Sequence, residues 1–289
     1  MRRTLNISGR LLAGCALAGL LAAGTTARAD SFADLLSGGA GPGTYAVLGL
    51  ANGTINLSLV TVNGNVGIAA GGSIINMAPS KIVGNVYESA SGQYSGPGTL
   101  TGTKNINLPL LATNASAALN AASDAAAATA TQTFASGISS ATVITGVAGL
   151  NVIDVTGNIN LNNANLTLSG PAGATFIINV SGGLSLVGTA GLMSAGVADS
   201  NILYNFTATN AAINTHIGDQ VNGILLAAGG SSTMTLDGTF NGELIGHNIS
   251  LLSNAVVNQP TVTPEPATLL LLGTALLGLA FCRKRLFSA

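Results

Sequence analysis

The sequence has little charge and almost no cysteine. Only 7% of its 289 residues are charged, and its two cysteines are Cys15 and Cys282, close to the two ends. Residues 30–266 contain two basic residues, Lys81 and Lys104, and all ten acidic residues, which gives this span a net charge of −8. Because phosphate contacts need clustered Lys and Arg, this balance excludes nucleic acid as a partner. Without cysteine the same span has no disulfide, so packing alone must hold it together.

The sequence also lacks the motifs of the common catalytic classes. It contains no Gly-x-Ser-x-Gly elbow, no His-Glu-x-x-His, no cysteine pair and no acidic loop of the EF-hand kind. His216 and His247 have Asp219 and Glu243 nearby in the sequence, but none of them lies in a motif of known chemistry. We therefore predict no catalytic residue, no cofactor and a protein that is not an enzyme.

Isolated aspartates leave calcium binding between turns as an alternative, because some β-solenoids use aspartate there. The candidates are Asp154, Asp199, Asp219 and Asp237, but the repeat Gly-Gly-x-Gly-x-Asp is missing. We predict no metal site. The Gly-rich residues 37–43 are typical of a linker into the first strand rather than of a phosphate-binding loop.

The C-terminal residues 261–289 follow the order of a sorting signal. An apolar run over residues 267–282 lies between two short motifs, Pro264-Glu265-Pro266 and Arg283-Lys284-Arg285. This order resembles the PEP-CTERM sorting domain, also called the ice-binding protein C-terminal motif. The resemblance implies that an exosortase-type enzyme recognises the motif and cleaves near it.

The apolar run predicts a helix that spans a membrane marginally. Its 16 residues cover about 24 Å at ~1.5 Å per residue, against a hydrocarbon core of roughly 30 Å. The basic cluster would hold the C-terminus in the cytoplasm and leave everything before Pro264 outside. A buried core helix is the alternative, but it leaves three clustered charges unexplained. We expect a transient anchor in the inner membrane, before processing.

The N-terminal residues 1–29 predict a secretory signal peptide. Arg2, Arg3 and Arg10 precede an apolar stretch over residues 11–24, and Ala27-Arg28-Ala29 is an A-x-A cleavage site. A lipoprotein box at residues 12–15 is an alternative, although Arg10 stands almost against it, and Arg2-Arg3 alone leaves a twin-arginine signal open. Together the two signals point to a Gram-negative bacterium and to a cell-surface or extracellular destination.

After a linker over residues 30–43, residues 44–260 predict one all-β domain. Segments such as 60–68 and 166–168 alternate apolar with small polar residues, which is the pattern of strands with one buried face. The Gly-Asn pairs at 64–65 and 84–85 lie 20 residues apart, about one coil of a parallel β-solenoid, and 157–158 repeats the motif. Stacked asparagines can then bond along a ladder. A β-sandwich is the alternative.

One segment, about residues 108–129, breaks the β pattern and predicts an amphipathic helix. It is Ala-rich and free of glycine, and Pro109 suits its first turn. One face is expected to pack along the side of the solenoid, through Leu111, Ala115, Ala118, Leu119 and Ala122.

With these elements in place, the body resembles two families. The opening residues 45–50, the Gly-Asn-Val turns, the mid-chain helix and residues 174–186 look like the ice-binding-protein-like family. The resemblance implies an irregular β-helix with one helix alongside. Residues 202–206, 223–227 and 240–246 also resemble the choice-of-anchor A adhesins, which often carry the same anchor.

Ice binding needs regularly spaced threonines on a flat face, and the sequence offers only fragments of such a face. The local Thr-x-Thr pattern occurs at two distant places, Thr99-Leu100-Thr101-Gly102-Thr103 and Thr233-Met234-Thr235. Threonine also suits the solvent side of any strand. We therefore predict a structural or adhesive role in the cell envelope, polysaccharide matrix or biofilm, with ice binding as the alternative.

Overall fold

The computed structural model describes residues 45–259. The predicted signal peptide with Ala27 and Ala29, the linker, and the sorting domain with its apolar segment 267–282 lie outside the described residues. No helix within residues 45–259 is both long and apolar enough to cross a membrane.

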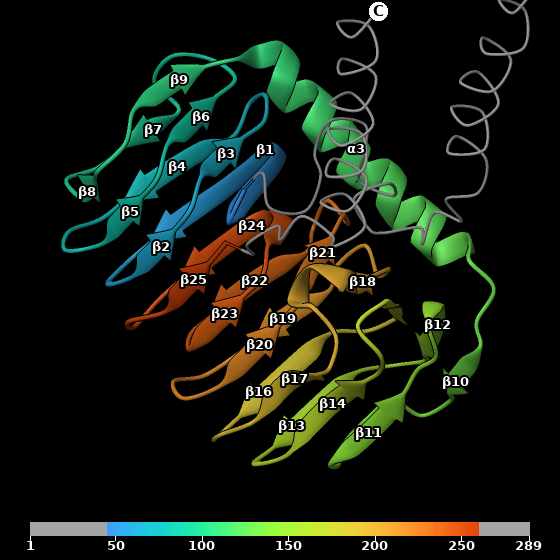
Figure 1. Cartoon of the computed structure of the whole chain (residues 1–289). Coiled ribbons are helices and arrows are strands. Elements are labelled where there is room, and N and C mark those ends of the chain that lie inside the picture. Colours follow the sequence, from blue (N-terminus) through green and yellow to red (C-terminus); the bar gives the residue numbers. More distant parts are fainter. Residues whose placement is uncertain (1–44, 260–289) are drawn as a thin grey trace, which may run out of the picture.

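The described residues form three rows of strands that stack as coils along one axis (Figure 1). Every strand pairing within residues 45–259 is parallel. This excludes the β-sandwich, whose sheets are antiparallel, and confirms a β-solenoid-like architecture.

The first row, here called the helix row, carries on its outer side the α-helix found within residues 45–259. Its strands, in spatial order, are β9 (Lys104–Ile106), β6 (Val86–Glu88), β3 (Val66–Ile68), β1 (Val47–Leu57), β24 (Leu244–Leu251), β21 (Ile224–Ala227), β18 (Ile202–Phe206), β15 (Ala174–Val180), β12 (Gly149–Val155) and β10 (Gln132–Phe134). A short 3₁₀ turn, η1 (Asp199–Asn201), precedes β18.

The second row, the open row, shares β1 and β24 with the helix row. Its other strands are β7 (Tyr94–Ser95), β4 (Ser73–Asn76), β22 (Thr233–Leu236), β19 (Ala212–Asn214), β16 (Leu184–Val187) and β13 (Ile159–Asn162). The third row, the ladder row, is a separate sheet: β8 (Thr99–Leu100), β5 (Lys81–Val83), β2 (Thr61–Asn63), β25 (Val256–Asn258), β23 (Thr239–Asn241), β20 (Gln220–Asn222), β17 (Gly191–Ala195), β14 (Asn165–Ser169) and β11 (Thr142–Thr145).

The Gly-Asn corners stack as their spacing predicts. Val62 pairs with Ile82, and both are fully buried, so the alternating pattern places its apolar residues in one continuous core. At the corner, the Asn65 Oδ1 accepts the backbone N–H of Asn85 at 3.0 Å, and the Asn85 Oδ1 accepts that of Thr103 at 3.0 Å. A Cβ on Gly84 would lie 2.3 Å from the Gly64 carbonyl oxygen, so this corner requires glycine.

The spatial order of the coils differs from their order in the sequence. β1 lies between β3 and β24, so the first coils of the chain stack on the last, as the adjacent blue and red strands of Figure 1 show. After β9 the helix α3 (Leu108–Ala127) carries the chain along the whole stack to β10 at the far end. The remaining strands then wind back toward β1.

The helix α3 agrees with its prediction except at one residue. The Asn107 Oδ1 accepts the N–H of Leu110 at 3.1 Å and caps the first turn, which contains Pro109. Leu111, Ala115 and Ala118 are buried as predicted, but Leu119 is 44% exposed. Small side chains let the helix axis approach the sheet closely, and a leucine at position 119 lies beyond that narrow contact.

Two asparagines of the helix row fasten the end of α3. The Asn179 Nδ2 donates to the carbonyl of Ala125 at 2.8 Å, and the Asn205 Nδ2 donates to that of Ala122 at 3.0 Å. At the other end of the contact, the Asn114 Nδ2 donates to the Tyr45 hydroxyl at 2.9 Å. Burial raises the pKa of Tyr45 to about 12, so this hydroxyl stays protonated at neutral pH.

Candidate functional site

The structure places the predicted threonines in two different rows. Thr99 lies in β8 of the ladder row, and the Thr101 and Thr103 hydroxyls donate inside the protein, to the Ile82 carbonyl at 3.2 Å and to the Asn85 Oδ1 at 3.1 Å. Thr233 and Thr235 lie in β22 of the open row, and both are exposed. The structure therefore does not bring the two groups together.

Thr235 is part of a longer column that runs along the outside of the open row. Six side chains lie in register on six successive strands, about 4.8 Å apart from one strand to the next. This open column consists of Asn160, Ser185, Asn214, Thr235, Ser250 and Asn56. The residues on either side of each one are mostly buried and apolar, for example Ile213 beside Asn214, so the column stands on a rigid base.

The open column presents free hydrogen-bonding groups. Within residues 45–259, none of its six side chains forms a hydrogen bond with another part of the protein, and all are exposed or half-buried. None is charged. Amides and hydroxyls supply both donors and acceptors, so the column can bond a partner that also carries both.

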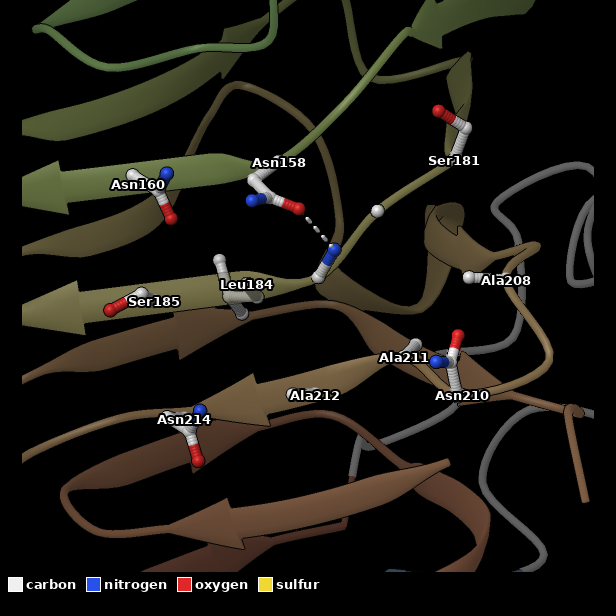
Figure 2. Close-up of a pocket in the computed structure, with 12 residues that line it drawn as sticks. Asn158, Asn160, Ser181, Leu184, Ser185, Ala208, Asn210, Ala211, Ala212 and Asn214 are labelled. Carbon is white, nitrogen blue, oxygen red and sulfur yellow. Dashed lines mark hydrogen bonds between the residues drawn. The ribbon is translucent and has the colours of Figure 1, made fainter. Parts of the chain in front are cut away.

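At the β13 end, the open column borders a groove of about 380 Å³. Figure 2 shows Asn160, Ser185 and Asn214 on three adjacent strands, with Ser181 and Asn210 on the loops beside them. The Asn158 Oδ1 accepts the N–H of Gly183 at 2.8 Å and fixes the rim. The groove has no charged lining residue, which suits an uncharged ligand.

The asparagines of the ladder row form the opposite arrangement. Asn63 donates to Asn258 at 2.9 Å, Asn258 donates to Asn241 at 2.9 Å, and Asn241 donates to Asn222 at 3.0 Å. The Asn222 Nδ2 donates to the Ser194 hydroxyl at 3.1 Å, and this hydroxyl donates to the Asp199 carboxylate at 2.7 Å. We call these four asparagines the asparagine ladder. The sequence predicts a ladder for the asparagines of the Gly-Asn corners, but those side chains bond backbone N–H groups, and the amide-to-amide ladder forms here instead.

The titratable residues singled out in the sequence support the backbone. The His216 Nδ1 lies 2.6 Å from the Leu186 carbonyl oxygen, and the His247 Nδ1 lies 3.0 Å from that of Ala51. Asp219 is buried and accepts the backbone N–H groups of Ala190 and His216 at 3.0 and 2.7 Å. These contacts fix corners of the solenoid.

The acidic residues do not gather in a metal-binding cluster. Within residues 45–259, no group of three or more His, Cys, Asp or Glu side chains is placed to hold a metal ion. Of the calcium candidates, Asp154 accepts from Asn179 at 3.1 Å and Asp199 from Ser194. The open column and its groove are thus the regular set of side chains in residues 45–259 whose hydrogen-bonding groups remain free.

Fold and site together define a class of protein: a β-solenoid with one helix alongside and one regular, uncharged, hydrogen-bonding face. The chain belongs to the family described as putative ice-binding-like adhesive domain, whose model matches residues 16–259. A PEP-CTERM protein-sorting motif matches residues 262–285. This motif indicates an exported protein with a membrane-anchored sorting signal, and it implies exosortase-mediated processing. Both predicted resemblances, to PEP-CTERM proteins and to ice-binding-like proteins, are confirmed.

Solved structures share the fold at low sequence identity. An ice-binding protein from an Antarctic biological consortium is 20% identical, with a TM-score of 0.53 over 76% of this chain and 89% of the other. One from an Antarctic bacterium of the Flavobacteriaceae is 17% identical, with a TM-score of 0.58 over 80% and 48%. A glycosylated one from an Arctic yeast is 22% identical, with a TM-score of 0.55 over 81% and 96%. No curated protein matches significantly.

Proposed function

We propose that the chain is an exported, non-enzymatic adhesive or structural protein, and that its open column binds neutral polysaccharide of the cell envelope, extracellular matrix or biofilm. The observation that carries the proposal is the open column itself: six polar, uncharged side chains, in register and without partners among the described residues. A glycan presents hydroxyls that donate and accept, which matches amides and hydroxyls on the protein.

Delivery and processing belong to the same proposal. Residues 1–29 would direct export, with cleavage after Ala29, and residues 267–282 would hold the chain in the inner membrane of a Gram-negative host. An exosortase would recognise Pro264-Glu265-Pro266 with the following basic cluster, and cleavage there would release the protein to the cell surface or the matrix. The PEP-CTERM match supports the step in which an exosortase recognises the C-terminal motif.

The polysaccharide proposal is tested by co-sedimentation of residues 30–259 with insoluble matrix polysaccharide from a biofilm. Because no charge takes part, binding should persist in high salt. Replacing Asn160 and Asn214 together by Ala should weaken binding about thirtyfold, since two hydrogen bonds of about 1 kcal/mol each are lost. The matched control is Asn120→Ala, an exposed asparagine on α3. Binding that high salt elutes, or that survives the double substitution, contradicts the proposal.

Ice binding is the second candidate, and the ice-binding proteins that share the fold favour it. It would use Thr233 and Thr235 of the open row, with Thr99, Thr101 and Thr103 of the other group as a separate candidate face. The test is inhibition of ice recrystallisation by residues 30–259. If residues 30–259 are active at micromolar concentration and Thr235→Lys abolishes this activity, ice binding becomes the preferred function and the open row is its ice-binding face. If Thr99→Lys abolishes the activity instead, the ice-binding face lies on the ladder row. If a folded sample does not inhibit recrystallisation, ice binding is excluded.

A further inference from the structure

The two ends of the solenoid differ in how their strand edges are protected. The end formed by β7, β8 and β9 holds Lys104 in an edge strand and Pro97 between β7 and β8, and Lys81 lies one strand further in. Lysine and proline are the residues that proteins place at sheet edges to prevent other chains from pairing there. The other end is a coil over residues 128–147. No charged residue and no proline occurs from residue 125 to residue 153.

This end coil presents backbone groups that have no partner. β10 pairs with β12 alone, β11 pairs with β14 alone, and Ile138 forms its one bridge with Ile159. Because each strand directs hydrogen-bonding groups to both sides, one set of N–H and C=O groups on each of these segments points away from the solenoid. Within residues 45–259 no further strand pairs with that set.

The end coil is nevertheless well packed inside, so its edge is a firm surface. Ile138 and Ile144 are 3% and 2% exposed and continue the core to the last coil. Its outer side carries two exposed apolar side chains: Val143 is 67% exposed and Val147 is 69% exposed. Exposed apolar side chains beside a bare strand edge are typical of a surface that pairs with another strand.

We propose that this end coil pairs edge to edge with the end coil of a second copy of the chain. Charge favours a second copy as the partner at this end. Two identical uncharged edges do not repel each other, whereas pairing at the opposite end would bring Lys81 and Lys104 of one copy against the same lysines of the other. A two-fold axis reverses the strand direction, so β11 would pair antiparallel with the partner's β11. Such a contact uses the same patch on both copies and closes at the dimer.

The alternation of side chains narrows the register of this pairing. Val143 and Thr145 point outward and Ile144 points inward, and facing strands must match outward with outward. Val143 therefore lies opposite Val143 or Thr145 of the partner. This inference does not depend on the ligand of the open column, but a dimer would carry two such columns and gain avidity for a polymeric ligand.

Sedimentation of the full chain in density-matched detergent tests the inference. We expect a particle with the protein mass of two chains. Val143→Lys combined with Thr145→Lys should give monomers, since both positions are exposed in a single copy and charge there opposes pairing. The matched control is Thr99→Lys, which places the same charge on edge strand β8 at the opposite end and should leave the dimer intact. Far-UV circular dichroism should be unchanged in each variant.

Three outcomes would overturn the proposed pairing of end coils. A monomeric wild-type chain at all concentrations would show that the edge serves a different partner or none. Dimers that survive the double lysine substitution would assign the contact to another segment. Longer assemblies, broken equally by lysine at either end, would mean that opposite ends join head to tail. Disulfide cross-linking gives a second test, in a chain whose native cysteines are removed by Cys15→Ser and Cys282→Ser. In this background Val143→Cys combined with Thr145→Cys should form a disulfide-linked dimer, and Thr99→Cys should not.

Discussion

The asparagine ladder and the open column use similar residues on similar strands, yet the amides of one bond each other and those of the other bond nothing in the described protein. In the ladder, Asn63, Asn258, Asn241 and Asn222 follow one another on adjacent strands, so each amide reaches the next. In the open column, Ser185 and Thr235 stand on either side of Asn214. At these positions the structure forms no bond between the hydroxyls and the neighbouring amides, although Asn222 of the ladder does reach the Ser194 hydroxyl from a diagonal position. An unbroken run of asparagines in register thus satisfies its own amides, whereas a column that alternates asparagine with Ser or Thr leaves its amides free for other partners.

The largest effect should come from the buried end of the asparagine ladder. Asn222 is 7% exposed, donates to Ser194 and accepts from Asn241 and Gln220. Asn222→Ala leaves these three groups without their partner and should lower the free energy of unfolding by about 2–3 kcal/mol. Urea unfolding followed by circular dichroism measures it. Asn214→Ala, in the open column, should lower the free energy of unfolding by less than about 0.5 kcal/mol. If both substitutions lower it equally, the two columns do not differ in their contribution to stability.

A gain of stability should follow when the open column is made continuous. Ser185→Asn would join Asn160 and Asn214 into a run of three amides on adjacent strands. Two new bonds, offset in part by the lower strand preference of asparagine, should add about 1 kcal/mol to the free energy of unfolding. Co-sedimentation with polysaccharide should weaken at the same time, because the amides are then occupied. Stabilisation without any loss of binding would show that free amides are not what the ligand contacts.

A smaller loss should follow at the exposed end of the ladder. Asn63 is exposed and makes a single ladder bond, to Asn258. Asn63→Ala should lower the free energy of unfolding by about 0.5–1 kcal/mol, because water can replace the lost donor. The shift of the urea midpoint at constant slope is the measurement. A cost as large as that of Asn222→Ala would mean that the ladder acts as one cooperative unit rather than as separate bonds.

The smallest effect concerns pH, because neither column contains a titratable side chain. Desolvation raises the pKa of the Asp237 carboxyl, which lies at the corner between the open and ladder rows, and the hydrogen bond with Ser253 opposes this. A carboxyl with a raised folded-state pKa favours folding when protonated, so its contribution is lost as pH rises through the acidic range. The melting temperature of Asp237→Asn should lack this slope. An unchanged pH profile would show that Asp237 does not produce it.

Features encoded within one coil could be predicted from the sequence. The Gly-Asn corners, the alternating strands, the helix and the sorting motif each depend on neighbouring residues. Each was correctly placed or matched, although the helix, predicted over about residues 108–129, ends at Ala127. The prediction that Leu119 packs against the solenoid was wrong. Helical spacing defines which residues share a face but not how wide the contact is, and a contact made by alanines is narrow.

Features that join different coils could not be predicted. The members of the open column are separated by unequal lengths of chain, since the coils differ in length, and Asn56 comes from the start of the chain. No fixed period therefore marks the column in the sequence. The pairing of β1 with β24 has the same character, because it joins residues about 200 positions apart, such as Val47 and Leu244.

The pairing of β1 with β24 has a consequence for biogenesis. In most stacked-repeat proteins folding can start anywhere and spread to the neighbouring repeat. Here the strand that completes the middle of the stack is among the last to leave a translocation pore, so the first coils must wait for it, and such long-range closure is slow. A prematurely terminated chain would lack the centre of its own fold. The complete stack therefore forms only when the chain is present up to β24, close to the start of the sorting motif.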